Sequence, residues 1–212
     1  MDGAGLQSTF APLPTRSLPV RDSTSRFASL RAFHYPAYVR IWTGAFVSNI
    51  GTWIQAISVG VYVTETTGQA GWTGTVAALA YAPTLFLAPL AGALADRFDR
   101  RRVILPLLGV QCAATVALAL LAATGALSIP VLAALVFASG CASALSNPAF
   151  NALLSELVAP EDLLSAVSLT SAQYNLARTL GPALAALILT LGGITVAFAV
   201  NALSFAAVIG AA

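Results

Sequence analysis

The chain has 212 residues, of which 58% are hydrophobic and only 8% are charged. A typical soluble domain has about 25% charged residues, so this composition excludes an ordinary water-soluble fold and places the chain among membrane proteins. The formal net charge is only +2, which gives no indication of a nucleic-acid partner. The positions of the basic residues are therefore more informative than their number.

The first 33 residues are polar and irregular, with three prolines and several serines and threonines. They contain no continuous apolar stretch, so they do not predict a cleavable signal peptide. This composition is typical of a segment that cannot bury enough apolar surface to fold. We therefore expect residues 1–33 to form a disordered cytoplasmic arm whose arginines help to orient the chain in the membrane.

Six apolar runs follow this arm, and each is long enough to cross a hydrocarbon core of ~30 Å as a helix that rises ~1.5 Å per residue. We place them at about 41–63, 72–95, 103–125, 129–150, 164–191 and 194–212. Buried helices of a soluble protein are the alternative, but such helices normally carry a charged face, and none appears here. The predicted fold class is an all-α integral membrane protein in which residues 34–212 form a six-transmembrane-helix bundle.

The arginines predict the orientation of this bundle. Nine of the ten lie either before the first span or between the second and third spans. Basic loops are retained on the cytoplasmic side of a membrane, so we expect both ends of the chain to be cytoplasmic. The predicted location is the cell membrane, inner or plasma, with membrane lipid around a multi-pass protein.

The loop between the second and third spans reads Gly92-Ala-Leu-Ala-Asp96-Arg97-Phe-Asp-Arg100-Arg101-Arg. It resembles the Gly-x-x-x-Asp-Arg-x-Gly-Arg-[Lys/Arg] signature between helices 2 and 3 of the major facilitator superfamily of secondary transporters. Aspartate stands at position 99, where that family usually has glycine. In the family, this loop contacts neighbouring helix ends and the opposite bundle to hold the outward-facing state. The resemblance implies the same latch here, in which Asp96 makes the contact and the three matching arginines support it.

Three further stretches resemble the enterobactin-exporter and drug-efflux branch of this superfamily. They are Phe33-His34-Tyr35-Pro36-Ala37-Tyr38, Ser48-Asn49-Ile50-Gly51-Thr52-Trp53-Ile54-Gln55 and Asn147-Pro148-Ala149-Phe150. The resemblance implies the amino-terminal half of a twelve-helix transporter that exports small amphipathic molecules, such as drugs or siderophores, by alternating access. A weak internal symmetry fits the 3+3 inverted repeat of such halves, because Ser-Asn recurs at 48 and 146 and proline at 83 and 182.

Polar residues inside the spans are the candidates for a substrate cavity. They are Asn49, Thr52, Gln55, Asn147, Asn175 and Arg178. Arg178 is the only ionisable residue well inside a span, so it should face protein or water. It would either attract an anionic or oxygen-rich substrate or bond helix-end carbonyls and tie its span to a neighbour. The uncharged residues would either line the cavity or bond across to other helices.

Gly181 and Pro182 predict a kink and close packing in the fifth span, and they resemble the Gly-Pro core of an antiporter motif. No acidic residue occupies the middle of any span, so a carboxylate that carries a coupling proton would belong to a second half or another chain. The acids after the fourth span (Glu156, Glu161 and Asp162) could form an ion pair with the 100–102 loop.

No enzyme signature is present, and no cofactor or metal site is predicted, because the sequence has a single histidine and no metal-ligand cluster. Cys112 and Cys141 lie in apolar runs, where buried small side chains are expected. The predicted partner is a second six-helix half from the same gene, a separate chain or a homodimer. The alternatives are a truncated fragment that does not transport and a membrane-embedded interaction module.

Overall fold

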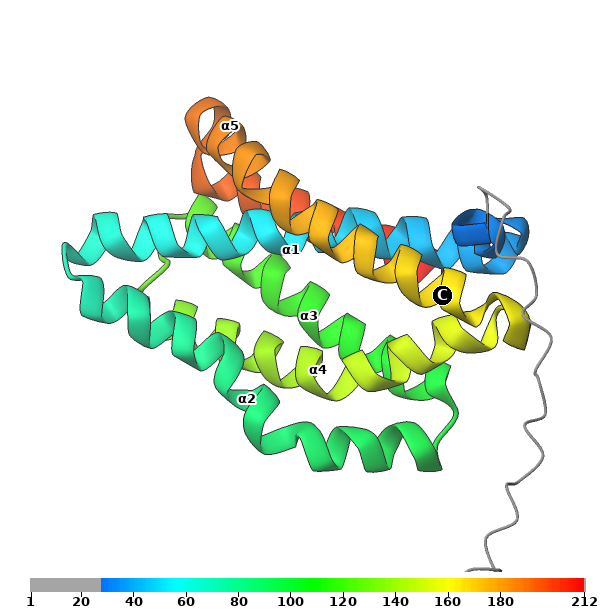
Figure 1. The fold of residues 1–212 in the computed structure, drawn as a ribbon. Coiled ribbons are helices and arrows are strands. Elements are labelled where there is room, and N and C mark those ends of the chain that lie inside the picture. Colours follow the sequence, from blue (N-terminus) through cyan, green and yellow to red (C-terminus); the bar gives the residue numbers. More distant parts are fainter. Residues whose placement is uncertain (1–27, 212) are drawn as a thin grey trace, which may run out of the picture.

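The computed structural model describes residues 28–211, and every regular element in this range is helical (Figure 1). The elements are the 3₁₀ helices η1 (Ala28–His34) and η2 (Pro160–Asp162) and the α-helices α1 (Pro36–Thr67), α2 (Ala70–Arg97), α3 (Arg100–Ala123), α4 (Ile129–Glu156) and α5 (Leu163–Ala211). Five helices of the described chain are long and apolar enough to cross a membrane. The predicted all-helical membrane class is consistent with this arrangement.

The longest element, α5, consists of two helical segments that meet at Gly193. Gly193 has φ 69° and ψ −171°, a conformation that glycine adopts without steric cost. The chain reverses direction there, so the second segment returns along the bundle (Figure 1). Ala166 of the first segment and Val208 of the second consequently belong to one apolar cluster with Tyr38 of α1. The two last predicted spans, 164–191 and 194–212, lie on either side of this turn.

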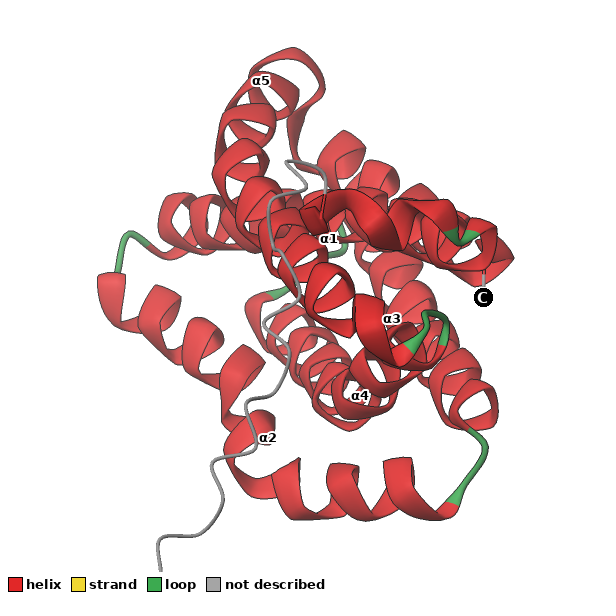
Figure 2. Ribbon diagram, turned by 45° about the vertical axis from the view of Figure 1, so that its right-hand side comes forward, coloured by secondary structure: helices red, strands yellow, loops and turns green. Residues whose placement is uncertain are grey.

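The five α-helices pack as two pairs, and α3 joins the two pairs. α1 lies along α5, α2 lies along α4, and α3 contacts both α4 and α5. α2 and α5 lie on opposite sides of the bundle in both views (Figure 1 and Figure 2). One apolar cluster lies near the arginine-rich 97–102 loop, here called the basic end, and a second lies toward the opposite end. This arrangement leaves room between the pairs for the cavity described below.

Large apolar side chains cover the outside of the bundle. Leu85, Phe86, Leu164, Leu191 and Leu203 are between 72% and 80% exposed. Burying one such side chain away from water is worth about 1.5–3 kcal/mol. An apolar surface of this kind is unfavourable in water but favourable against lipid tails or another apolar helix, which agrees with a membrane location.

The described end of the predicted arm is a helix that packs on the start of α5. The Ala32 backbone N–H donates to Ser165 Oγ at 3.1 Å, and the Tyr35 hydroxyl donates to Asp162 Oδ2 at 3.0 Å. Arg31 Nε lies 3.5 Å from the other Asp162 oxygen. The hydrogen bond to the Asp162 carboxylate raises the pKa of Tyr35. The rest of the arm, residues 1–27, lies outside the described residues.

Three glycines allow helices to approach closely, two of them between α1 and α5 and one between α2 and α4. An added Cβ would overlap Ser204 of α5 if placed on Gly51, and Trp53 of α1 if placed on Gly181. A Cβ on Gly140 would overlap the α2 backbone. Small residues at such crossings let helix backbones pack tightly where lipid offers no hydrophobic driving force.

Replacing Gly51 by alanine is expected to lower the thermal stability of the detergent-solubilised chain, because the new methyl group would push α1 away from α5. Overpacking a tight interior typically costs about 1–3 kcal/mol. Gly60→Ala on the same helix is the matched control, since a Cβ there meets nothing within 4 Å. Melting curves followed by circular dichroism measure the difference. Equal melting midpoints for the two variants would contradict the close approach at Gly51.

Candidate functional site

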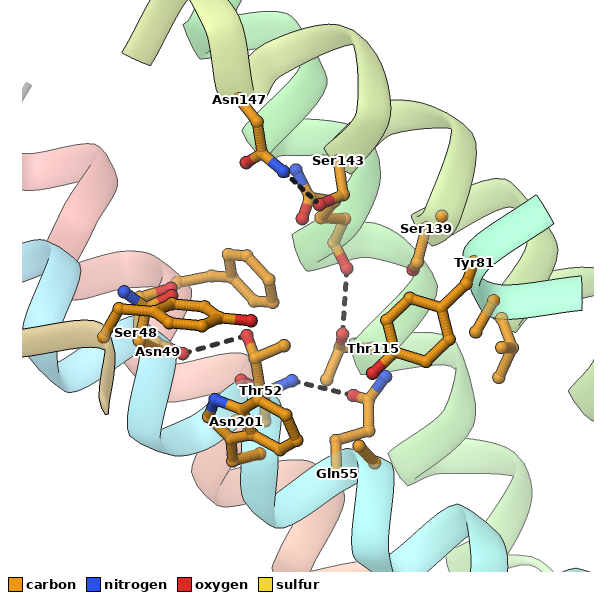
Figure 3. A pocket seen from close by; sticks show the side chains of 18 of the residues that line it. Ser48, Asn49, Thr52, Gln55, Tyr81, Thr115, Ser139, Ser143, Asn147 and Asn201 are labelled. Carbon is orange, nitrogen blue, oxygen red and sulfur yellow. Dashed lines mark hydrogen bonds between the residues drawn. The ribbon is translucent and has the colours of Figure 1, made fainter. Parts of the chain in front are cut away.

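A cavity of about 910 Å³ lies within the bundle, and residues of all five α-helices line it (Figure 3). Its polar groups are amides and hydroxyls, and eight of the lining side chains are asparagine or glutamine. No Asp, Glu, Lys, Arg or His of the described residues lines it. The wall also includes apolar and aromatic side chains, among them Trp53, Tyr81 and Phe150. A mixture of apolar surface and a few fixed polar groups is typical of small-molecule sites.

The structure brings five of the six predicted cavity residues to this wall. Asn49, Thr52 and Gln55 come from α1, Asn147 from α4 and Asn175 from the first segment of α5. Several of these side chains also bond locally. Thr52 Oγ1 donates to a backbone carbonyl of its own helix at 2.9 Å, and the Asn147 amide donates to a neighbouring serine at 3.3 Å. A role in substrate binding stays a prediction for all five.

Arg178, the sixth predicted residue, is exposed and is not among the lining residues. Its guanidinium carbon lies 5.8 Å from the centroid of the Trp53 ring, which does line the cavity. The Tyr174 ring meets the same indole edge-on, with 6.1 Å between ring centroids. A cation–π contact at an exposed site is worth about 0.5–1 kcal/mol. Arg178 thus lies beside the cavity wall, behind an aromatic side chain.

Gly181 and Pro182 follow one turn further along α5. Gly181 is buried against Trp53, whereas Pro182 is exposed. Backbone dihedral angles remain helical at both positions, and within α5 only Gly193 departs from them. The structure therefore places Gly181 at a helix crossing and the chain reversal twelve residues later, at Gly193.

A buried hydrogen-bond network that the sequence did not predict connects α1 to the second segment of α5. The Asn201 amide nitrogen donates to Gln55 Oε1 at 2.8 Å, and Ser204 Oγ lies 2.9 Å from Asn201 Oδ1. Asn201 is only 1% exposed, although its side chain also reaches the cavity wall. An uncharged polar residue in an apolar span is the signal that would have pointed to it.

The opposite wall of the cavity carries a hydroxyl with no partner. Ser139 Oγ of α4 is buried, and no described residue forms a hydrogen bond with it. Gln111 and Thr115 of α3 also line this side. A buried hydroxyl without a partner costs free energy. A hydrogen bond from Ser139 to a water molecule or a ligand would recover that cost.

The loop residues that match the major facilitator signature lie at the basic end. Asp96, Arg100 and Arg101 line a small cleft of about 340 Å³ with Glu156 of α4. Arg100 forms an ion pair with Glu156, which confirms the predicted pairing between this loop and an acid after the fourth span. The other two predicted residues, Gly92 and Arg97, belong to the last turns of α2, and a Cβ on Gly92 would meet nothing within 4 Å.

Asp99, which replaces the glycine of the family signature, is the N-cap of α3. Its Oδ1 accepts a hydrogen bond from the Arg102 backbone N–H at 3.1 Å. Aspartate is a favoured N-cap because its side chain satisfies one of the free N–H groups at a helix start. The loop turns here without a left-handed residue, since Asp99 has φ −55°. The sequence signal for this cap is an acid directly before the three arginines that begin an otherwise apolar helix.

Arg100→Gln and Glu156→Gln are each expected to lower the melting midpoint, and the double variant should lose little more than the larger single loss, because both remove one ion pair. The two side chains are 29% and 57% exposed, so we expect a coupling energy of only about 0.2–1 kcal/mol. Arg101→Gln is the matched control, since Arg101 has no carboxylate partner among the described residues. Strictly additive losses in this double-mutant cycle would contradict the pairing.

Curated relatives of the chain are bacterial transporters. The Staphyloferrin A transporter of Staphylococcus aureus is 30% identical over 70% of this chain and 38% of its own length. Macrolide efflux protein A of Streptococcus pyogenes is 26% identical over 78% of this chain and 41% of its own length. An uncharacterized MFS-type transporter of Bacillus subtilis, YkuC, is 26% identical over 79% and 39%, respectively. The chain thus spans roughly two fifths of the length of these relatives.

No solved structure matches the chain. A family model does, and its match extends over residues 24–212. That model is described as a transmembrane secretion effector of the major facilitator superfamily. Its members are transporters and not enzymes, and the apolar helices of the described chain agree with a multi-pass membrane protein. The chain belongs to this family of major facilitator transporters.

Proposed function

We propose that the chain is the amino-terminal six-helix half of a secondary transporter that exports small amphipathic molecules from the cytoplasm. The observation that carries this proposal is a cavity with uncharged amide and hydroxyl groups in a mainly apolar wall, within a bundle whose outer surface is apolar. Its volume of about 910 Å³ suits a drug-sized molecule, because such sites typically measure about 300–1,000 Å³. The names of two relatives, a siderophore transporter and a macrolide efflux protein, support the same class of cargo.

The internal arrangement supports a repeat of two three-helix units. Gly193 divides α5, and the segment after it would be the sixth membrane-crossing helix of the proposed half. The Ser-Asn dipeptide occurs twice, beginning at Ser48 in α1 and at Ser146 in α4. Both serines line the same cavity from different helices. Helices at corresponding positions of two inverted repeats would be expected to face one central site.

A second half would complete the transporter. Exposed apolar side chains of α2 and of the first segment of α5, such as Phe86 and Leu164, offer a surface for it on opposite sides of the bundle. In the proposed cycle, the two halves rock around the cavity and open it alternately to each side of the membrane. The Arg100–Glu156 ion pair holds the basic loop to α4, while the exposed Asp96 and Arg97 are free to latch onto the partner half.

Energy coupling is proposed to depend on that second half. In the described chain, no carboxylate lines the cavity, and amide and hydroxyl side chains cannot carry a proton at physiological pH. A coupling proton would therefore bind an acidic residue of the second half or of another chain.

The proposed orientation places the basic end in the cytoplasm. In a variant without Cys112 and Cys141, a cysteine at Phe98 is expected to resist a membrane-impermeant maleimide in intact cells and to react after permeabilisation. A cysteine at Ala126, in the loop at the opposite end, is the matched control and should react in intact cells. Both positions are exposed, so access depends on the side of the membrane. Labelling of the Phe98 position in intact cells would overturn the topology.

Transport is tested by the accumulation of three compounds, neutral chloramphenicol, a macrolide and staphyloferrin A, in cells that keep the gene at its native locus. Deleting the gene is expected to raise the accumulation of an exported compound. Asp96→Asn and Arg178→Ala are each expected to slow efflux roughly tenfold, which corresponds to about 1.4 kcal/mol. Glu65→Gln, at an exposed position of the opposite end, should leave efflux unchanged. Normal efflux in both site variants would contradict these assignments, and unchanged accumulation after deletion would favour a non-transporting module.

A further inference from the structure

The cavity wall contains hydrogen-bonding groups of defined direction but no charge in the described chain, and this combination selects for a particular ligand chemistry. We infer that the cavity takes neutral, oxygen-rich amphipathic molecules and that Gln55 is the residue that selects them, by donating its amide N–H groups to a ligand oxygen. This inference rests on the proposed transport function, because it names the class of substrate for the same cavity.

The absence of charge from the described wall disfavours ionic ligands. An ion that leaves water for a poorly solvating site costs several kcal/mol unless an opposite charge or several hydrogen bonds compensate. The charged groups at the basic end form their own cleft, and Arg178 lies behind the Trp53 ring. Neutral molecules avoid this desolvation cost, whereas charged ones gain no counter-ion from the lining residues.

The orientation of the Gln55 amide follows from the buried network. Ser204 Oγ donates to the Asn201 backbone carbonyl at 2.7 Å and shares the same proton with Asn201 Oδ1 at 2.9 Å, since both oxygens can only accept. The Asn201 nitrogen is then directed to Gln55, whose carbonyl oxygen accepts at 2.8 Å. The Gln55 nitrogen consequently points away from this bond (Figure 3), and no described residue accepts a hydrogen bond from it. Gln55 therefore presents donors to the cavity, and Asn201 is a positioning residue.

The rest of the wall fits the same ligand class. Ser139 Oγ is buried without a partner on α4, across the cavity from the α1 residue Gln55 (Figure 3). Its hydroxyl can donate to a ligand oxygen or accept from a ligand hydroxyl. Trp53 and Tyr81 add aromatic surface to the lining of the same cavity. A molecule with ether, carbonyl or hydroxyl oxygens on an apolar frame would satisfy both walls without bringing a charge into the bundle.

Binding to the purified chain in detergent tests this inference by equilibrium dialysis. The probes are chloramphenicol, which is neutral, its hemisuccinate ester, which is an anion, and its deacylated amine, which is a cation. We expect chloramphenicol to bind roughly tenfold more tightly than either charged derivative. Gln55→Leu should weaken chloramphenicol binding about five- to tenfold, as for a lost hydrogen bond. Gln69→Leu, in the loop at the opposite end, is the control and should bind normally.

A variant of Asn201 separates positioning from general damage to the fold. Asn201→Asp replaces the donor by an acceptor, so the Gln55 amide should turn its nitrogen toward Asp and its carbonyl toward the cavity. Chloramphenicol should then bind more weakly, while the amine derivative should bind more tightly. A uniform loss of affinity for all three probes at an unchanged melting midpoint would overturn the role of the network.

Two further outcomes would overturn the inferred ligand class. One is equal affinity of the wild-type chain for neutral and charged probes, and the other is a normally folded wild-type chain that binds none of them. These outcomes are distinct from a failure of the proposed function, because dialysis needs no transport. Selective binding in a protein that exports nothing would refute only the transport proposal.

Discussion

The structure depends on one constraint, which is that a charge cannot be placed in hydrocarbon without a large cost in free energy. The chain meets it by separating two kinds of polarity. The described arginines other than Arg178 gather at the basic end, where Arg100 pairs with Glu156, and the interior relies on amides and hydroxyls that can be hydrogen-bonded without a counter-ion. The same separation leaves the outer surface apolar and gives the cavity uncharged polar groups in a mainly apolar wall, within the described chain.

Polar side chains inside the bundle can form hydrogen bonds between helices only where the helices lie close together. Gly51 provides such an approach, because a Cβ there would overlap Ser204 of the second α5 segment. Asn201 is 1% exposed and would be costly to bury alone, but it bonds both Ser204 and Gln55. The small residue Gly51 thus allows the close helix contact in which the polar network between α1 and α5 forms.

The sequence was sufficient for the features that a bilayer imposes locally. Helical spans and the position of the charged loop follow from composition along a few tens of residues. Charge alone indicated that this loop could pair with an acid after the fourth span, but it did not distinguish Glu156 from Glu161 and Asp162. Contacts between distant segments were not predictable in this way. The partner of Gln55 lies 146 residues further along the chain, and the carboxylate that holds Tyr35 lies 127 residues away. Arg178 shows the same limit, because periodicity predicts the face it occupies but not the Trp53 ring that it meets.

A neutral amide network also suits a site that must open to both sides of a membrane. In the proposed cycle, water enters and leaves the cavity, so a charged wall would need a counter-ion in every state. Gln55, Asn201 and Ser204 all belong to α1 and α5 of one bundle, and their mutual hydrogen bonds therefore need not break when that bundle moves against a partner. The donors offered to a substrate would keep their direction throughout. A site built in this way loses the affinity of an ion pair, but it can release its ligand on either side without separating two charges in a low-dielectric interior.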